Sequence, residues 1–480
     1  MSQWLLVTGE VVALGAVTAY TCCNFASSDA LSIILAFAVA YLIPRFIYSR
    51  SKAACTWGQW WLLVVGALMA VYTIYSIKVC TQIPNFSLEE PNLHSDDGGY
   101  YSWALSHYDG RCPEPNVIYC GVSIVMLALW KVLGVSIVWP LALNFMCILL
   151  AIVTTGKIAH RLLSHHFTST APSAIVAWAM VMTSLLCFLV SQSVRIQKEA
   201  FCTLAIVVVG YSLAGMSLKN QSKKAKRADM VLFVAGTLLL AFVRTNFVYF
   251  IVMGAVMMAA ARKGAQWKRG TLMAAFALAV TFLFNYIYNY TIEHQLVMLS
   301  GGEAMARDFK IGTAQLPYVI LIGDYHFFPE WERLLLIPIT TGVQYIIPFP
   351  WLYDYSHASI LSLLPRIRLM WYIVGGACIF YFLYINVLHP KTSNLGMWAW
   401  WPLVTFACMS YVTGGLVSRY ALPIQPLFVV IALYVFLHFK EGRYRRSFTM
   451  WMIAYTLILV ATLVFCYHTQ VDYLRSQHII

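Results

Sequence analysis

The sequence predicts an all-α polytopic membrane protein with about 11–13 transmembrane helices, built as a single domain over residues 1–480. Hydrophobic residues make up 61% of the chain, charged residues only 11%, and the mean hydropathy is +0.72. A soluble domain carries about 25% charged residues. The apolar residues recur in runs close to the ~20 residues that a helix needs to cross a bilayer. Short basic clusters separate these runs, a pattern typical of membrane proteins.

About thirteen apolar runs are candidates for transmembrane helices. They lie at residues 4–23, 29–48, 57–79, 136–155, 173–190, 200–217, 229–243, 246–261, 271–290, 366–388, 397–414, 421–439 and 448–468. The first run is not preceded by a basic segment and carries Glu10, so we expect a retained helix and not a signal peptide. Inside a transmembrane helix, Glu10 is expected to pair with another helix or to line a cavity.

Lysine and arginine residues predict which side of the membrane each loop occupies. They gather in Arg45–Lys52, Lys157–Arg161, Lys219–Arg227, Arg262–Arg269, Lys391 and Lys440–Arg446. A thirteen-span model with alternating sides places all of these loops on one face, which is then cytoplasmic. The N-terminus is therefore expected inside and the C-terminus outside, in a bacterial inner membrane with periplasmic outer loops. This orientation accounts for the net charge of +13 without a nucleic-acid partner.

Two long polar segments, 80–117 and 291–365, fall on the outer side and carry most of the acidic residues. Function is expected in these loops. The apolar stretch 334–347 is broken by Pro338, which predicts a re-entrant or interfacial helix. Residues 118–130 are also too short to cross and are expected along the outer face. The charged residues and histidines of the second segment could hold an acceptor sugar or lie in a solvated loop.

The first polar segment contains two adjacent carboxylates, Asp96 and Asp97, followed by two glycines and then Tyr100 and Tyr101. Adjacent carboxylates raise each other's pKa, and a cleft at the bilayer edge limits solvation, so one of them can act as a general base. The pair could equally bind a divalent cation such as Mg²⁺ or Mn²⁺. A turn in a solvated loop is the third interpretation.

This acidic pair, followed after two residues by an aromatic residue, resembles the signature of the glycosyltransferase C superfamily. Protein O-mannosyltransferases and lipid A aminoarabinose transferases belong to that superfamily. In the family, the first acid of an Asp-Glu pair, four residues before the aromatic residue, is the catalytic base. Asp96 with Tyr100 matches that spacing, and Asp97 with Tyr101 matches it as well. The chain has Asp97 where family members commonly have Glu.

Basic residues on the outer side are candidates for binding a phosphate, because arginine can pair with it bidentately in a low-dielectric site. Arg195 and Lys198 lie beside Glu199 in the turn between two runs, and Arg244 lies between two short runs. The alternative is that each arginine snorkels to the headgroups or pairs with a structural acid.

Two of these features also resemble the superfamily. The basic and acidic turn at Arg195–Glu199 is similar to a cluster at the corresponding family turn, and Arg419-Tyr420 is similar to the Arg-Tyr pattern that opens a late helix there. The resemblance implies that the donor phosphate is bound by Arg195, Lys198, Arg244 and Arg419. It implies that the substrates contact Tyr100, Tyr101, Glu199 and Tyr420.

The resemblance implies a membrane glycosyltransferase that moves a sugar from a polyprenyl-phosphate donor to a glycan, lipid or protein acceptor on the periplasmic face, with inversion. A close alternative is a polysaccharide polymerase or ligase with a lipid-pyrophosphate donor, since such proteins rely on periplasmic arginines and a long outer loop. A transporter or flippase for lipid-linked glycans is a third class. It would be expected to show internal repeats and charges inside the spans.

Most of the twelve cysteines lie inside apolar runs, where they are expected to be small core residues. Cys80, Cys112 and Cys120 flank the first polar segment and could form a disulfide, but the sequence does not choose the pair. The histidines do not show the spacing of a metal site.

Overall fold

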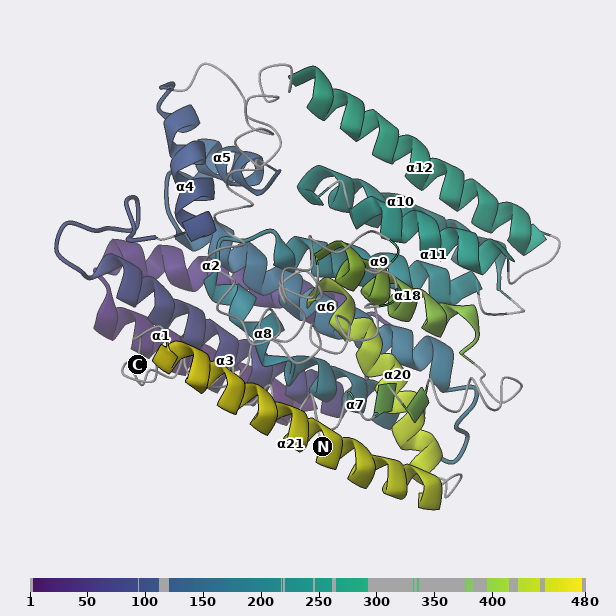
Figure 1. Cartoon of the computed structure of the whole chain (residues 1–480). Helices are drawn as coiled ribbons and strands as arrows, with labels where there is room; N and C mark the ends of the chain where they lie inside the picture. Colours follow the sequence, from purple (N-terminus) through teal and green to yellow (C-terminus); the bar gives the residue numbers. More distant parts are fainter. Residues whose placement is uncertain are drawn as a thin grey trace.

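The computed structural model describes residues 3–93, 95–111, 121–216, 221–244, 247–260, 265–291, 395–413, 422–440 and 445–476, with single positions besides. Within these residues the regular secondary structure consists of α-helices and short 3-10 helices, joined by turns and loops, with no strand. Figure 1 shows the helices packed side by side. The predicted all-α class is therefore confirmed.

The chain order of the described helices follows the apolar runs closely. They are α1 (Gln3–Asn24), α2 (Ser27–Ser49), α3 (Thr56–Thr81), α4 (Ser95–Tyr108), α5 (Gly121–Leu133), α6 (Val138–Leu163), α7 (Pro172–Ser184), α8 (Cys187–Val190), η2 (Ser191–Val194), α9 (Glu199–Met216), α10 (Lys223–Arg244), α11 (Val248–Ala260), α12 (Ala265–Thr291), α18 (Met397–Thr413), η7 (Leu422–Ile424), α20 (Gln425–Lys440) and α21 (Arg445–Ser476).

Seven of the described helices are long and apolar enough to cross a membrane: α1, α2, α3, α6, α9, α12 and the segment Leu422–Lys440. The chain is thus an integral membrane protein of the polytopic helical class. The wider count of 11–13 helices stays a prediction, because the predicted run 366–388 and the second polar segment lie largely outside the described residues.

The centre of the bundle is formed by α6 and α9, with α1 at its margin (Figure 1). Of the most apolar stretch of each helix, 83% is buried in α9 but only 17% in α1. Exposed apolar side chains such as Val12 on α1 and Leu35 on α2 therefore suit contact with lipid.

The first polar segment contains a helix, α4, that the sequence analysis treats as a loop. Tyr100, Tyr101 and Ala104 are buried on it and join the apolar core together with Trp130 of α5. Burial of this stripe outweighs the low helix propensity of the two glycines in its first turn. α4 and α5 stand at the end of the bundle where α3 ends (Figure 1).

Two predicted spans also differ from the structure in their boundaries. The run 173–190 is interrupted, because α7 ends at Ser184 and the chain continues through α8 and η2 before α9. The run 229–243 is extended at its start, because α10 begins at Lys223 inside the basic cluster. The extra turns let Asp229 lie within the helix and not at its first residue.

Asp229 is the centre of a buried ion cluster that joins α6, α10 and α12. The Nη1 and Nη2 atoms of Arg161 donate to its two carboxylate oxygens at 2.9 and 3.1 Å, and Nη2 of Arg269 lies 3.5 Å from Oδ2. Gln221 also donates to this carboxylate, and Arg161 donates to the carbonyl of Tyr211 at 2.9 Å. Asp229 is only 2% exposed, so its charge depends on these partners.

We expect Gly215→Ala to destabilise this cluster. A Cβ atom at Gly215 would lie 2.0 Å from Oδ2 of Asp229, which forces the carboxylate away from its partners. The overpacking should cost about 1–3 kcal/mol of unfolding free energy and lower the thermal midpoint of the solubilised protein.

Gly15→Ala is the matched control, because nothing lies within 4 Å of a Cβ atom placed there. It adds the helix propensity of alanine, about 1 kcal/mol, without a clash. Equal thermal midpoints for the two variants would contradict the role given to Asp229.

Candidate functional site

Asp97, in the first turn of α4, meets Arg195, which lies between η2 and α9. The Nε atom of Arg195 is 3.2 Å from Oδ2 of Asp97. Asp97 is buried, whereas the Arg195 side chain is 48% exposed. The exposure of Arg195 leaves it accessible to a ligand and makes the pair a weak source of stability.

The segment that carries Arg195 is fixed by polar groups of two transmembrane helices. Asn144 of α6 is 1% exposed, and its Nδ2 atom donates to the carbonyl of Arg195 at 2.5 Å and to that of Gln197 at 3.3 Å. The Thr73 hydroxyl of α3 donates to that of Ser193 at 3.0 Å. These bonds hold Arg195 in an extended backbone conformation at the start of α9.

Lys198 and Glu199, which follow this segment, contact α4 and α10. The Nζ atom of Lys198 is 6.0 Å from the ring centroid of Tyr100, which brings a second cation to α4. Glu199 is 2% exposed, and its Oε1 accepts from Nη1 of Arg244 at 3.4 Å. The Arg244 guanidinium also lies 4.3 Å from the ring centroid of Phe247. Glu199 thus neutralises the charge of Arg244 between α9 and α10.

Tyr101 has a structural position. Its hydroxyl donates to the backbone carbonyls of Glu89 at 2.8 Å and Leu88 at 3.3 Å, and its ring packs edge-on against Trp130 at 4.8 Å. Burial, with a further contribution from the charges of Glu89 and Glu90, raises the pKa of the Tyr101 phenol. The hydroxyl therefore stays protonated and ties α4 to the preceding chain.

Several predicted site residues are not described by the structure. Asp96 lies in the first turn of α4, but its side chain is outside the described residues, and Arg419 and Tyr420 are outside them altogether. The same holds for Cys112 and Cys120, so a disulfide with Cys80 stays a prediction.

A divalent cation on Asp96 and Asp97 stays a prediction, because the Asp96 side chain lies outside the described residues. The described residues contain no group of three His, Cys, Asp or Glu side chains close enough to ligate a metal ion. Asp97 directs Oδ2 at a guanidinium, which would compete with a metal for the same oxygen.

The described cluster has a surplus of positive charge. Arg195 pairs with Asp97 and Arg244 with Glu199, and Lys198 lies near the Tyr100 ring as a third cation. Since Arg195 is also half-exposed, this end of the bundle suits an anionic group such as a phosphate.

Asn144 is a site residue that the sequence analysis missed. The signal was present, because an asparagine inside the apolar run 136–155 needs hydrogen-bond partners in a transmembrane helix.

The chain was compared with protein-family models, with curated proteins and with solved structures, and none of the three comparisons gave a match.

Glu199→Ala should destabilise the protein by about 3 kcal/mol, because it leaves the charge of Arg244 without its partner in a site where the arginine is only 14% exposed. Unfolding of the solubilised protein by heat or denaturant measures the change. The double variant Glu199→Ala/Arg244→Leu should recover part of the loss, since it removes both charges.

Glu90→Ala is the control for this prediction. Glu90 is exposed, so its truncation should change the free energy of unfolding by no more than about 0.5 kcal/mol. If Glu199→Ala behaves like Glu90→Ala, the ion pair between α9 and α10 does not form.

Proposed function

We propose that the chain is a membrane glycosyltransferase of the glycosyltransferase C type, which transfers a sugar from a polyprenyl-phosphate donor to an acceptor with inversion. The observation that supports this proposal is the contact between Asp97 and Arg195. Asp97 is a candidate base and Arg195 a candidate phosphate ligand, and they lie about a hundred residues apart in the sequence. An acid beside accessible cations is what this reaction requires.

The proposal divides the work between the two carboxylates. Oδ2 of Asp97 is engaged by Arg195, so Asp97 is given the role of positioning that arginine. Asp96 is given the role of base, as the family resemblance implies. It takes the proton of the acceptor hydroxyl as the hydroxyl oxygen attacks the anomeric carbon. The bond from that carbon to the phosphate oxygen breaks, and the phosphate leaves with the electron pair.

The cations stabilise the leaving group in this proposal. Arg195 is the accessible guanidinium, and Lys198 approaches α4 beside it. Both can pair with a phosphate as its negative charge increases. Arg244 is given a weaker role in binding the phosphate, because its guanidinium is already bound to Glu199. Arg419 and Tyr420 are kept as expectations from the resemblance.

The arrangement of α10 supports an outer position for the site. Asp229 and Arg244 lie on the same helix, 15 residues apart, which corresponds to roughly 22 Å along its axis. The basic run Lys219–Arg227 is at the Asp229 end, and basic loops favour the cytoplasm. Arg244 and the candidate site then belong to the opposite, periplasmic face of a bacterial inner membrane.

An activity measurement tests the assignment of roles. Purified protein is supplied with polyprenyl-phosphate-linked sugars and an acceptor-containing lipid extract, with and without chelator. We expect Asp96→Asn to lower transfer by about 10²–10⁴-fold, the contribution of a general base. Arg195→Gln and Asp97→Asn should each lower transfer, because both disturb the same phosphate contact.

The matched controls are Asp109→Asn and Arg111→Gln. These residues form an exposed ion pair of 2.6 Å at the other end of α4, and their loss should change transfer less than twofold. Full activity of both Asp96→Asn and Asp97→Asn would contradict the proposed site. Transfer only from a pyrophosphate-linked oligosaccharide would identify a polymerase or ligase instead.

Epitope tags test the proposed orientation. A tag inserted after Asp109, in the turn that follows α4, should bind antibody from the periplasmic side of intact spheroplasts. A tag inserted after Lys52, an exposed residue of the basic loop between α2 and α3, should bind only after the membrane is permeabilised. The reverse pattern would place the site in the cytoplasm.

A further inference from the structure

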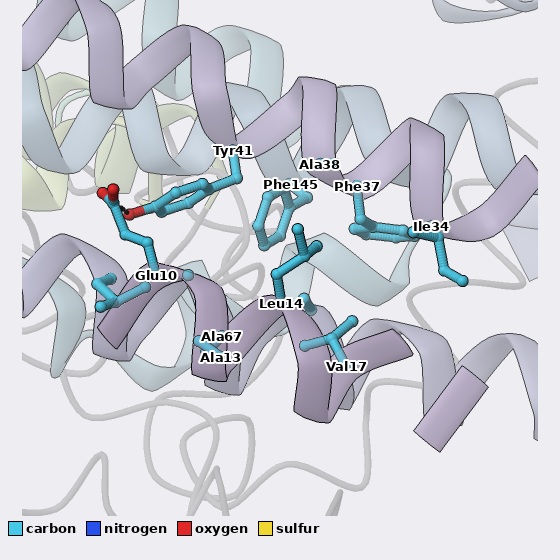
Figure 2. A pocket seen from close by; sticks show the side chains of 13 residues that line it. Glu10, Ala13, Leu14, Val17, Ile34, Phe37, Ala38, Tyr41, Ala67 and Phe145 are labelled. Atoms are coloured by element: carbon cyan, nitrogen blue, oxygen red, sulfur yellow. Dashed lines mark hydrogen bonds between the residues drawn. The ribbon is translucent and has the colours of Figure 1, made fainter. Parts of the chain in front are cut away.

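An apolar pocket lies between α1, α2 and α3, with Phe145 of α6 at its base. Its volume is about 60 Å³, several times the ~10–15 Å³ that one water molecule needs on the same measure. Figure 2 shows Glu10 and Tyr41 together at one end of the pocket and Ile34 and Val17 at the other. The pocket is therefore a slot between transmembrane helices with a single polar end.

Small residues create this space. Ala13 of α1, Ala38 of α2 and Ala67 of α3 line the pocket where larger apolar residues would fill it. Gly66 also lines it, and a Cβ atom there would lie 2.8 Å from the Tyr41 ring. The Tyr41 ring thus has room to stand beside Glu10 at the polar end.

The polar end is an ion pair with unused donors. The Nε atom of Arg45 donates to Oε1 of Glu10 at 2.5 Å, and the Tyr41 hydroxyl donates to the same oxygen at 3.2 Å. A guanidinium carries five N–H donors. Arg45 places Nε on Glu10 and also lies beside the Tyr41 hydroxyl, so part of its donor set is left for a second acceptor.

Arg45 lies near the end of α2, where a lipid headgroup is expected. Arg45 lies four residues before the end of α2, roughly 6 Å along the helix axis. Trp4 at the start of α1 and Trp57 at the start of α3 lie at the same end and are 81% and 75% exposed, as in an interfacial aromatic belt. Arg50, beyond Arg45, lies over the Phe46 ring and does not line the pocket.

We propose that this pocket binds one anionic phospholipid of the surrounding bilayer, with the phosphate on Arg45 and an acyl chain in the slot between α1 and α2. An anionic headgroup is favoured because Arg45, bound to Glu10 at the polar end, has further N–H donors, and the remaining lining is apolar. The chain fits because the slot runs along helices that face hydrocarbon. This inference does not depend on the proposed glycosyltransferase activity.

Native mass spectrometry of the delipidated, detergent-solubilised protein tests the proposal. The protein is titrated with phosphatidylglycerol and with phosphatidylcholine of identical acyl chains. The first bound phosphatidylglycerol should have a Kd about tenfold lower than the first bound phosphatidylcholine. Equal affinities for the two lipids would overturn the proposal.

Two pairs of variants locate the lipid. Ala13→Phe fills the slot and should abolish this tight binding, whereas Val12→Phe, at a neighbouring position that is 65% exposed, should leave it unchanged. Arg45→Gln should remove the preference for phosphatidylglycerol, whereas Arg50→Gln should change the Kd less than twofold. Equal losses within either pair would mean that the lipid binds to the general surface, and would overturn the proposal.

A double variant separates lipid binding from folding, because Arg45→Gln alone leaves the charge of Glu10 without its partner. The double variant Glu10→Gln/Arg45→Gln carries no charge at the polar end and keeps the shape of the Glu10 side chain. It should fold and accept an acyl chain but show no preference between the two lipids. A retained preference in this variant would exclude Arg45 as the phosphate ligand.

Discussion

A charge inside a bundle of apolar helices must be paired, because a bilayer offers no water to solvate it. The described part of the chain meets this constraint with ion pairs between helices. Glu10 joins α1 to α2, Asp229 joins α10 to α6 and α12, and Glu199 joins α9 to α10. Each pair fixes the rotation of two helices about their axes. Apolar packing alone would leave that rotation less specific. The rest of the arrangement depends on these contacts.

The ion pairs of Asp229 and Asp97 differ in the exposure of their cations. Asp229 is enclosed by two arginines and a glutamine, and none of these partners is widely exposed. By contrast, Arg195 is half-exposed although its partner Asp97 is buried. A pair with one accessible cation can still bind an anion, which is why we place the site there.

The candidate site also depends on ordinary helix packing. Asn144 lies in an apolar helix and fixes the backbone of Arg195 and Gln197, while Tyr101 ties α4 to the chain before it. Neither residue carries a charge. Together they set the positions of the charged groups, because a salt bridge at a half-exposed site is too weak to hold two segments in place by itself.

The sequence by itself determined the membrane class, the approximate boundaries of most described helices, and the residue types available for chemistry. The length of an apolar run and the position of a basic cluster are local properties, so they can be recognised without knowledge of the fold. Only the tertiary structure decided that α4 is a helix, that Asp97 pairs with Arg195, that Glu199 pairs with Arg244, and that the Tyr101 hydroxyl bonds to the backbone of Glu89. Those outcomes depend on how the helices are rotated and which faces they bury against each other. Such long-range geometry is not written in the spacing of residues along the chain.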